Sequence, residues 1–218
     1  MMNSSFDWID KGTNHLEKDE LTKALSIFNE VIKKDPENIR AWFLRSEVEF
    51  VQKKYREAFK SLKTVINLDP GHVEAWINMG NTYRELAGVR RGKVLEKNGP
   101  KSLIHFKFTP NEIELLNQSL KSFNRALKLK ENHENALMGK SGVLLSLEKY
   151  RETIETFDLL IKHHPRSRHY FHALLGKANA LKHINEKRKA KKILKEVKKK
   201  SPKSSDVQKM AEMALKYL

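Results

Sequence analysis

The sequence predicts an all-α protein built from repeated pairs of helices, and three observations support this fold class. Trp8, Trp42 and Trp76 recur at intervals of 34 residues, so the chain copies itself. Each copy holds two stretches with apolar residues at i, i+3, i+4 and i+7, the spacing of an amphipathic helix. Pro36 and Pro70 stop the second stretch of the first two copies, because proline disfavours a helical conformation at the residue before it.

The copy over residues 39–72 is the clearest unit of two helices joined by a turn. A unit of this length and composition resembles the tetratricopeptide repeat. In the next copy Trp76, Gly80 and Tyr83 match the W-x-x-x-G-x-x-Y pattern of that family. The resemblance implies a right-handed α-solenoid, in which the first helices of successive repeats line a concave groove that usually holds a peptide or another protein.

The predicted array is a single domain over residues 1–218. Gly12 and Ser46 occupy the position where the two helices of one repeat pass closest, so a small side chain is expected there. A capping helix must cover the apolar surface that the last repeat would otherwise expose. We expect the packed face of that helix to consist of Val207, Met210, Ala211, Ala214 and Leu215. The predicted segments are repeats at 5–38, 39–72, 73–133, 134–167 and 171–204, and the cap at 205–218.

One insertion interrupts the register. The second-helix signature of repeat three begins at Ser119, which is 27 residues later than the period demands, so the insertion spans residues 88–114. We expect a short extended strand within residues 102–108 and then a helix over residues 110–130, with Pro110 in its first turn. A loop of this length inside a compact array is usually functional or mobile.

The predicted peptide-binding groove follows from the positions next to each tryptophan-like residue. These positions hold Ile9, Phe43, Ile77, Met138 and Leu175, and an outer row adds Phe50. The polar members of the predicted groove are Asn78, Asn81, Arg84 and Asn179. Packing between helices does not require this second, mostly apolar row, and an exposed apolar patch often marks an interaction site. The alternative is that these side chains pack against neighbouring repeats through tight curvature.

Two further interpretations of the groove stay open. The insertion carries Leu103, Ile104, Phe106 and Phe108, which are apolar enough to fill the groove from within the chain or to recruit a partner. Family members that hold the carboxylate of chaperone tails use lysine and asparagine in their early repeats, and repeats one and two lack them at the matching places. A peptide backbone could instead hydrogen-bond to the asparagines of the predicted groove.

The net charge of +16 is concentrated near the end of the chain. Ten basic residues against two acidic ones lie between Lys182 and Lys200. This stretch is predicted to form the second helix of repeat five, and it could bind an acidic partner or nucleic acid, or it could be a solvated helix face. The stretch lacks aromatic residues for stacking on single-stranded bases. The predicted basic surface consists of Lys187, Arg188, Lys191, Lys192, Lys195, Lys198 and Lys199.

Composition excludes several classes of function. The absence of cysteine rules out disulfides, thiol catalysis and cysteine-based zinc sites. No apolar run reaches the ~20 residues that span a bilayer, and no signal peptide is recognisable, so a cytoplasmic location without membrane association is expected. The stretch over residues 88–94 resembles a phosphate-binding loop only superficially, and His169 and His172 form at most an incomplete metal site.

The sequence therefore predicts a non-catalytic scaffold without cofactor or metal. Its expected ligand is a peptide or protein held in an apolar concave groove. The alternative is an adaptor that binds nucleic acid or an acidic partner through the lysine-rich end.

Overall fold

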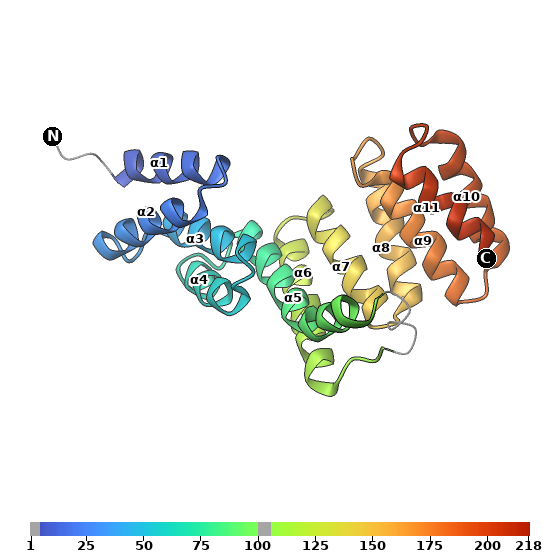
Figure 1. Ribbon diagram of the computed structural model, residues 1–218, viewed down its shortest axis with the longest axis horizontal. Helices are drawn as coiled ribbons and strands as arrows, with labels where there is room; N and C mark the ends of the chain where they lie inside the picture. The colour runs from blue at the N-terminus through green and yellow to red at the C-terminus, as the bar shows by residue number, and fades with distance from the viewer. Residues whose placement is uncertain (1–4, 100–105) are drawn as a thin grey trace. The chain divides into compact units, whose positions relative to one another are not determined.

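The computed structural model describes residues 5–99 and 106–218, and no residue in these ranges lies in a β-strand (Figure 1). The predicted all-α repeat fold is confirmed. The helices are α1 Ser5–Glu17, α2 Leu21–Lys34, α3 Ile39–Val51, α4 Tyr55–Leu68, α5 Val73–Asn98, α6 Pro110–Leu129, α7 Glu134–Ser146, α8 Tyr150–His163, α9 Tyr170–His183, α10 Lys187–Lys200 and α11 Asp206–Lys216.

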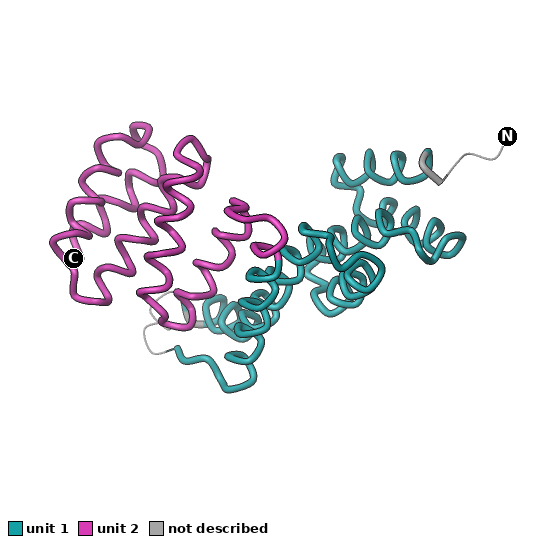
Figure 2. Tube along the Cα trace, turned by 180° about the vertical axis from the view of Figure 1, so that it is seen from behind, with its two compact units in different colours: residues 1–125 teal, residues 126–218 magenta. Residues whose placement is uncertain are grey.

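The chain divides into two compact units, residues 1–125 and 126–218, and the division falls inside α6 (Figure 2). In the first unit each helix from α1 to α4 packs against the next one, and α3 also contacts α1 and α5. In the second unit the same pattern runs from α7 to α11, with α9 also contacting α11. In the first unit the first helices of successive repeats, α1, α3 and α5, therefore lie next to one another.

Two tryptophans fix the turn that precedes their helix. Trp42 Nε1 donates a hydrogen bond of 2.8 Å to the carbonyl of Pro36, and Trp76 Nε1 donates one of 3.0 Å to the carbonyl of Pro70. Asn38 caps α3, because its Oδ1 accepts a 3.0 Å hydrogen bond from the third backbone amide of that helix. The 34-residue spacing of the tryptophans thus reflects a repeated contact between a helix and the turn before it.

The turn between the two helices of a repeat uses a left-handed backbone conformation without glycine. Lys53 has φ 59°, and the amide of the next residue donates a 2.8 Å hydrogen bond back to the carbonyl of Glu49. This arrangement satisfies a carbonyl that the end of the helix leaves open. The residues at the equivalent place in three other repeats are Asp19, Glu148 and Asn185, with φ between 58° and 65°.

The helices of a repeat meet where an aromatic ring faces a residue without a side chain. A Cβ atom built on Gly80 would lie 2.8 Å from Cζ of Phe123, and one on Gly12 would lie 2.5 Å from Cε1 of Phe28. Both rings are fully buried. Ser46, which holds this position in repeat two, is also buried. The expectation of a small residue at this crossing agrees with the structure.

The insertion differs from its prediction. Residues 88–98 continue α5 as helix, because proline is absent until residue 100, and Gly99 ends the helix with φ 72°. The residues 106–108 form no strand, and Leu103 and Ile104 lie outside the described residues. The helix expected over residues 110–130 is α6.

Arg90 joins the end of the insertion to α5. Its guanidinium donates two hydrogen bonds of 2.9 and 2.7 Å to Glu112 and a third of 2.6 Å to the carbonyl of Lys107. It also lies 4.4 Å from the ring of Phe106, which contacts the ring of Phe108 edge to face. Arg90 holds the pKa of the Glu112 carboxyl at about 2. Phe106 and Phe108 are therefore attached to the outer part of α5.

We expect Gly80→Ala to lower the free energy of unfolding by about 1–3 kcal/mol, because the new methyl group overlaps the buried ring of Phe123. Gly88 lies in the same helix with open space around its Cα, so Gly88→Ala should raise the free energy of unfolding by about 0.5–1 kcal/mol. Urea denaturation followed by circular dichroism measures both values. Equal effects of the two substitutions would contradict the packing explanation.

Candidate functional site

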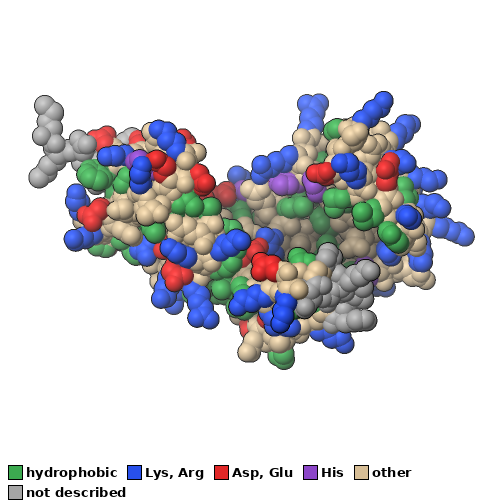
Figure 3. All heavy atoms as spheres, in the orientation of Figure 1, with side chains coloured by type: hydrophobic (Ala, Val, Ile, Leu, Met, Phe, Trp, Pro, Cys, Tyr) green, Lys and Arg blue, Asp and Glu red, His purple; other side chains and the backbone are tan. Residues whose placement is uncertain are grey.

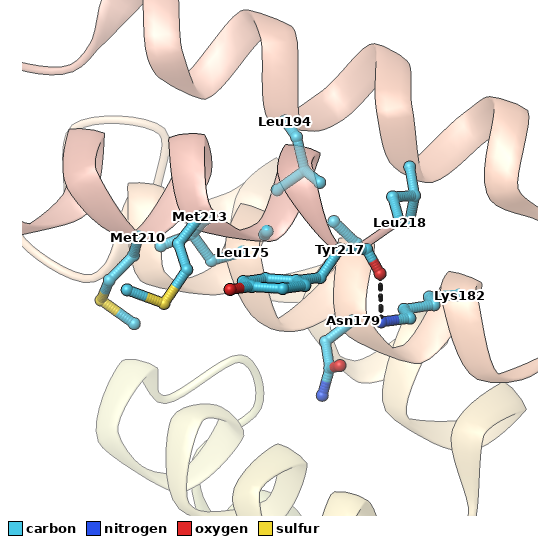
Figure 4. Close-up of a pocket in the computed structure, with 10 residues that line it drawn as sticks. Leu175, Asn179, Lys182, Leu194, Met210, Met213, Tyr217 and Leu218 are labelled. Carbon is cyan, nitrogen blue, oxygen red and sulfur yellow. Dashed lines mark hydrogen bonds between the residues drawn. The ribbon is translucent and has the colours of Figure 1, made fainter.

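The second unit contains an open apolar pocket of about 300 Å³ between α9, α10 and α11 (Figure 4). Leu175 and Asn179, two residues of the predicted groove, both line it from α9. We call this site the α9–α11 pocket. Its lining residues are Leu175, Ala178, Asn179, Lys182, Leu194, Met210, Met213, Ala214, Tyr217 and Leu218.

Two adjacent apolar stripes on α11 create one wall of this pocket. The first stripe includes the fully buried Ala211 and packs on α9 and α10. The second stripe consists of Met210, Met213 and Tyr217, at i, i+3 and i+7, and these side chains are 51%, 64% and 66% exposed. Met210 was predicted on the packed face, and that prediction is wrong because its register belongs to the second stripe.

The polar side chains of the α9–α11 pocket, Asn179 and Lys182, lie along one edge. Lys182 Nζ donates a 2.9 Å hydrogen bond to the carbonyl of Tyr217, which ties α9 to the end of α11 (Figure 4). The amide of Asn179 is exposed beside it. An apolar wall with a few polar groups at its edge is the usual composition of a ligand site, and methionine adapts to ligands of different shape.

The structure corrects two members of the predicted groove. Ile9 and Ile77 are each 3% exposed and offer no surface to a ligand. Ile9 packs with Val31, Ile32 and Ala41, which belong to its own repeat and to the next one. The packing alternative therefore holds for Ile9, and Ile77 is equally buried.

Three other predicted groove residues are half-buried. Phe43 stacks on His72 with ring centroids 4.8 Å apart, and Phe50 meets Tyr55 edge to face at 5.3 Å. Met138 packs against the core cluster of α7 and α8. Each side chain has neighbours that fix it and keeps only part of its surface for a partner.

One of the polar residues predicted on α5 contacts a carboxyl group. Asn78 hydrogen-bonds the side chain of Glu47, and Arg84 pairs with Glu85 at 3.4 Å, whereas Asn81 is half-exposed. Burial raises the pKa of the Glu47 carboxyl, the hydrogen bond from Asn78 opposes this shift, and the charge of Glu74 adds to it. An acidic group at this place disfavours the binding of a ligand carboxylate.

The predicted basic surface lies on α10, and all seven of its residues are exposed. Lys198 pairs with Glu212 at 3.1 Å. The other six form no ion pair with any residue that the structure describes. The apolar side of α10 is buried against α9 and α11.

Histidines gather around one acidic residue between repeats four and five. His164 Nδ1 and His169 Nε2 lie 3.8 and 3.7 Å from the Glu134 carboxylate, which also accepts a 2.5 Å hydrogen bond from Ser167. His172, the predicted partner of His169, is exposed. Over residues 5–99 and 106–218, no group of three or more metal-ligating side chains has the arrangement of a metal site.

The described helices include none that is both long enough and apolar enough to cross a membrane.

Comparisons with known proteins connect this architecture to a family. A family model for the tetratricopeptide repeat matches residues 172–204, which hold most of α9 and all of α10. A search of curated protein sequences finds no match. Among solved structures, MamA is 18% identical, aligns over 100% of this chain and 97% of its own, and has a TM-score of 0.69.

Two further solved structures are described by what they bind. YrrB, a TPR protein with an unusual peptide-binding site, is 17% identical over 99% of this chain and 93% of its own, with a TM-score of 0.66. The first TPR of Spaghetti (RPAP3), bound to the HSP90 peptide SRMEEVD, is 16% identical over 66% of this chain and 92% of its own, with a TM-score of 0.52. At these identities the likeness establishes the fold.

We expect Glu47→Gln to leave stability unchanged below about pH 4 and to increase it at pH 7. The folded-state pKa of Glu47 is raised, so the folded protein binds more protons than the unfolded chain just above the ordinary pKa. The free energy of unfolding therefore falls as the pH rises through this window, and glutamine removes that loss. Urea denaturation at both pH values, with the exposed Glu30→Gln as control, tests this. A gain that is equal at both pH values would contradict it.

Proposed function

We propose that this chain is a tetratricopeptide-repeat protein and a non-catalytic scaffold that binds a peptide or protein partner at the α9–α11 pocket. The observation that carries the proposal is the exposed stripe of Met210, Met213 and Tyr217 beside Leu175 and Asn179. Large apolar side chains that remain exposed together, with polar groups at the edge, are typical of interaction sites.

The chemistry of the α9–α11 pocket supports a particular kind of peptide. A volume of about 300 Å³ suits one or two apolar side chains rather than a whole folded domain. Asn179 can donate to and accept from a peptide backbone, and Lys182 stands at the same edge. Residues 126–218 carry 22 Lys and Arg against 10 Asp and Glu. We therefore infer an apolar anchor residue flanked by acidic residues.

Peptide binding is also consistent with the two solved structures whose descriptions mention peptides. Those descriptions apply to the proteins named, and they support a peptide ligand here only as a class. The half-buried Phe43 and Met138 remain candidates for additional contacts along first helices. The cytoplasmic location stays a prediction.

Selection from a phage-displayed random peptide library against the whole chain tests this function. We expect enriched peptides to share an apolar anchor next to acidic residues. Synthetic copies of those peptides should bind Met213→Ser at least about tenfold more weakly, because complete burial of a methionine side chain is worth about 1.5–3 kcal/mol and a tenfold change corresponds to about 1.4 kcal/mol. Fluorescence anisotropy measures the dissociation constants.

Leu159→Ser is the matched control, because Leu159 is 44% exposed on α8 and does not line the pocket. Its dissociation constants should equal those of the parent. Circular dichroism should show intact folds for both variants, since each side chain is largely exposed. Equal binding by the two variants, or a library without enriched peptides, would refute the proposed site.

A further inference from the structure

The helix α10 presents cations that the proposed peptide site does not use. Its buried residues Ala190, Leu194 and Val197 define the side that packs on α9 and α11. Four basic residues recur at i, i+4, i+7 and i+11 and therefore lie together on the opposite side. This α10 stripe consists of Arg188, Lys192, Lys195 and Lys199.

The α10 stripe carries charge that the described residues do not neutralise. The ion pairs of this helix involve Lys189, Lys198 and Lys200, which lie to either side of the stripe. Within the stripe, like charges follow each other at three and four residues, a spacing at which they repel on a helix. Lys187 and Lys191 add two more unpaired cations on one flank. An external polyanion would relieve this repulsion.

The repeat fold does not require cations at these four positions. The equivalent positions of α2 and α8 hold neutral, acidic and basic residues in mixture. They are Thr22, Ser26, Asn29 and Lys33 in α2, and Arg151, Glu155, Asp158 and Lys162 in α8. The helix α4 holds three cations there, Arg56, Lys60 and Lys63, followed by Asn67, so among these four second helices only α10 carries a cation at all four positions.

The surroundings of α10 reinforce the field of the stripe. Residues 126–218 hold 12 of the 16 net positive charges of the chain. Lys and Arg side chains project around the edge of this unit in the space-filling view (Figure 3). A surface of this kind attracts polyanions from a distance, and the affinity of such binding falls steeply as the salt concentration rises.

We propose that the α10 stripe binds the phosphate backbone of double-stranded DNA without reading its sequence. The stripe extends over about 16 Å along a rigid helix, and a helix of about 10–12 Å diameter fits the major groove of B-DNA, which is about 12 Å wide. The major groove of an RNA duplex is deep and too narrow for side chains. Three of the four cations are lysines, which act as point charges for phosphate.

Other polyanions fit the exposed face of α10 less well. A single strand would need aromatic side chains for stacking, and α10 has none. A membrane surface would favour exposed apolar residues beside the cations, whereas the apolar residues of α10 are buried or half-buried. Duplex DNA therefore fits the exposed face of α10 better than a single strand or a membrane surface does.

The test measures binding of a fluorescent DNA duplex of about 20 base pairs by anisotropy between about 50 and 200 mM salt. Four neutralised phosphates should give a slope of log K against log salt of roughly −4, a loss of affinity of roughly 100-fold over this range. The variant Arg188→Gln/Lys192→Gln/Lys195→Gln should bind at least about tenfold more weakly at low salt and show a slope shallower by roughly 2 to 3.

The helix α4 supplies a matched control with the same charge change. Arg56, Lys60 and Lys63 hold the equivalent positions of α4, are exposed and form no ion pair with any described residue. Arg56→Gln/Lys60→Gln/Lys63→Gln should change DNA affinity by no more than about twofold. Equal losses in the two triple variants would mean that net charge alone drives binding, and this would overturn the proposal.

Competition distinguishes DNA from other polyanions. Unlabelled DNA duplex should displace the probe more efficiently than an RNA duplex, polyglutamate or phosphatidylserine vesicles at equal charge concentration. The proposal fails if any of these three competes as well as DNA, or if the parent chain does not bind the probe at low salt. None of the three substituted α10 residues lines the α9–α11 pocket, so peptide affinity there should change by no more than about twofold, and the two proposals succeed or fail separately.

Discussion

The close contact between the two helices of a repeat is the constraint on which the rest of the structure depends. A buried ring on the second helix, such as Phe28 or Phe123, lies against a glycine on the first helix. This contact lets the helix axes approach and removes the apolar faces from water. Because one helix pair leaves apolar surface open on its side, it must stack on another pair.

Stacking explains why part of the predicted groove is unavailable to a ligand. Ile9 packs against its own repeat and the next one, and both Ile9 and Ile77 are buried. The α9–α11 pocket remains open because α11 has two apolar stripes and only one of them packs on α9 and α10. The apolar surface that a ligand can reach is thus the part that repeat packing leaves unused.

The outer sides of the second helices are under no such constraint. Their inward residues, such as Ala58 and Ala190, are fully buried, whereas the outward positions touch solvent and accept residues of any charge. Glu49 shows the opposite situation, because it is 3% exposed and must accept hydrogen bonds from Arg45 at 2.8 Å and Ser61 at 2.6 Å. The buried carboxylate of Glu49 is thus held by hydrogen bonds within the array. The cations of the α10 stripe form no ion pair with a described residue and are accessible to a partner.

The sequence by itself determined the repeat fold and the small residues at helix crossings, because both follow from local spacing that a helix converts directly into a face. It also led to the predictions of Leu175 and Asn179, which line the α9–α11 pocket, and of the basic residues of α10, which are exposed. The tertiary structure alone decided that Ile9 and Ile77 are buried, that Met210 is exposed and that α5 continues to Asn98. These outcomes depend on which neighbour covers a given stripe, and the pattern of one helix does not contain that information. The left-handed turns at Lys53 and its equivalents were not predicted, for a related reason. A hydrogen bond back to the preceding helix stabilises this conformation, and the residue types at these positions do not indicate it.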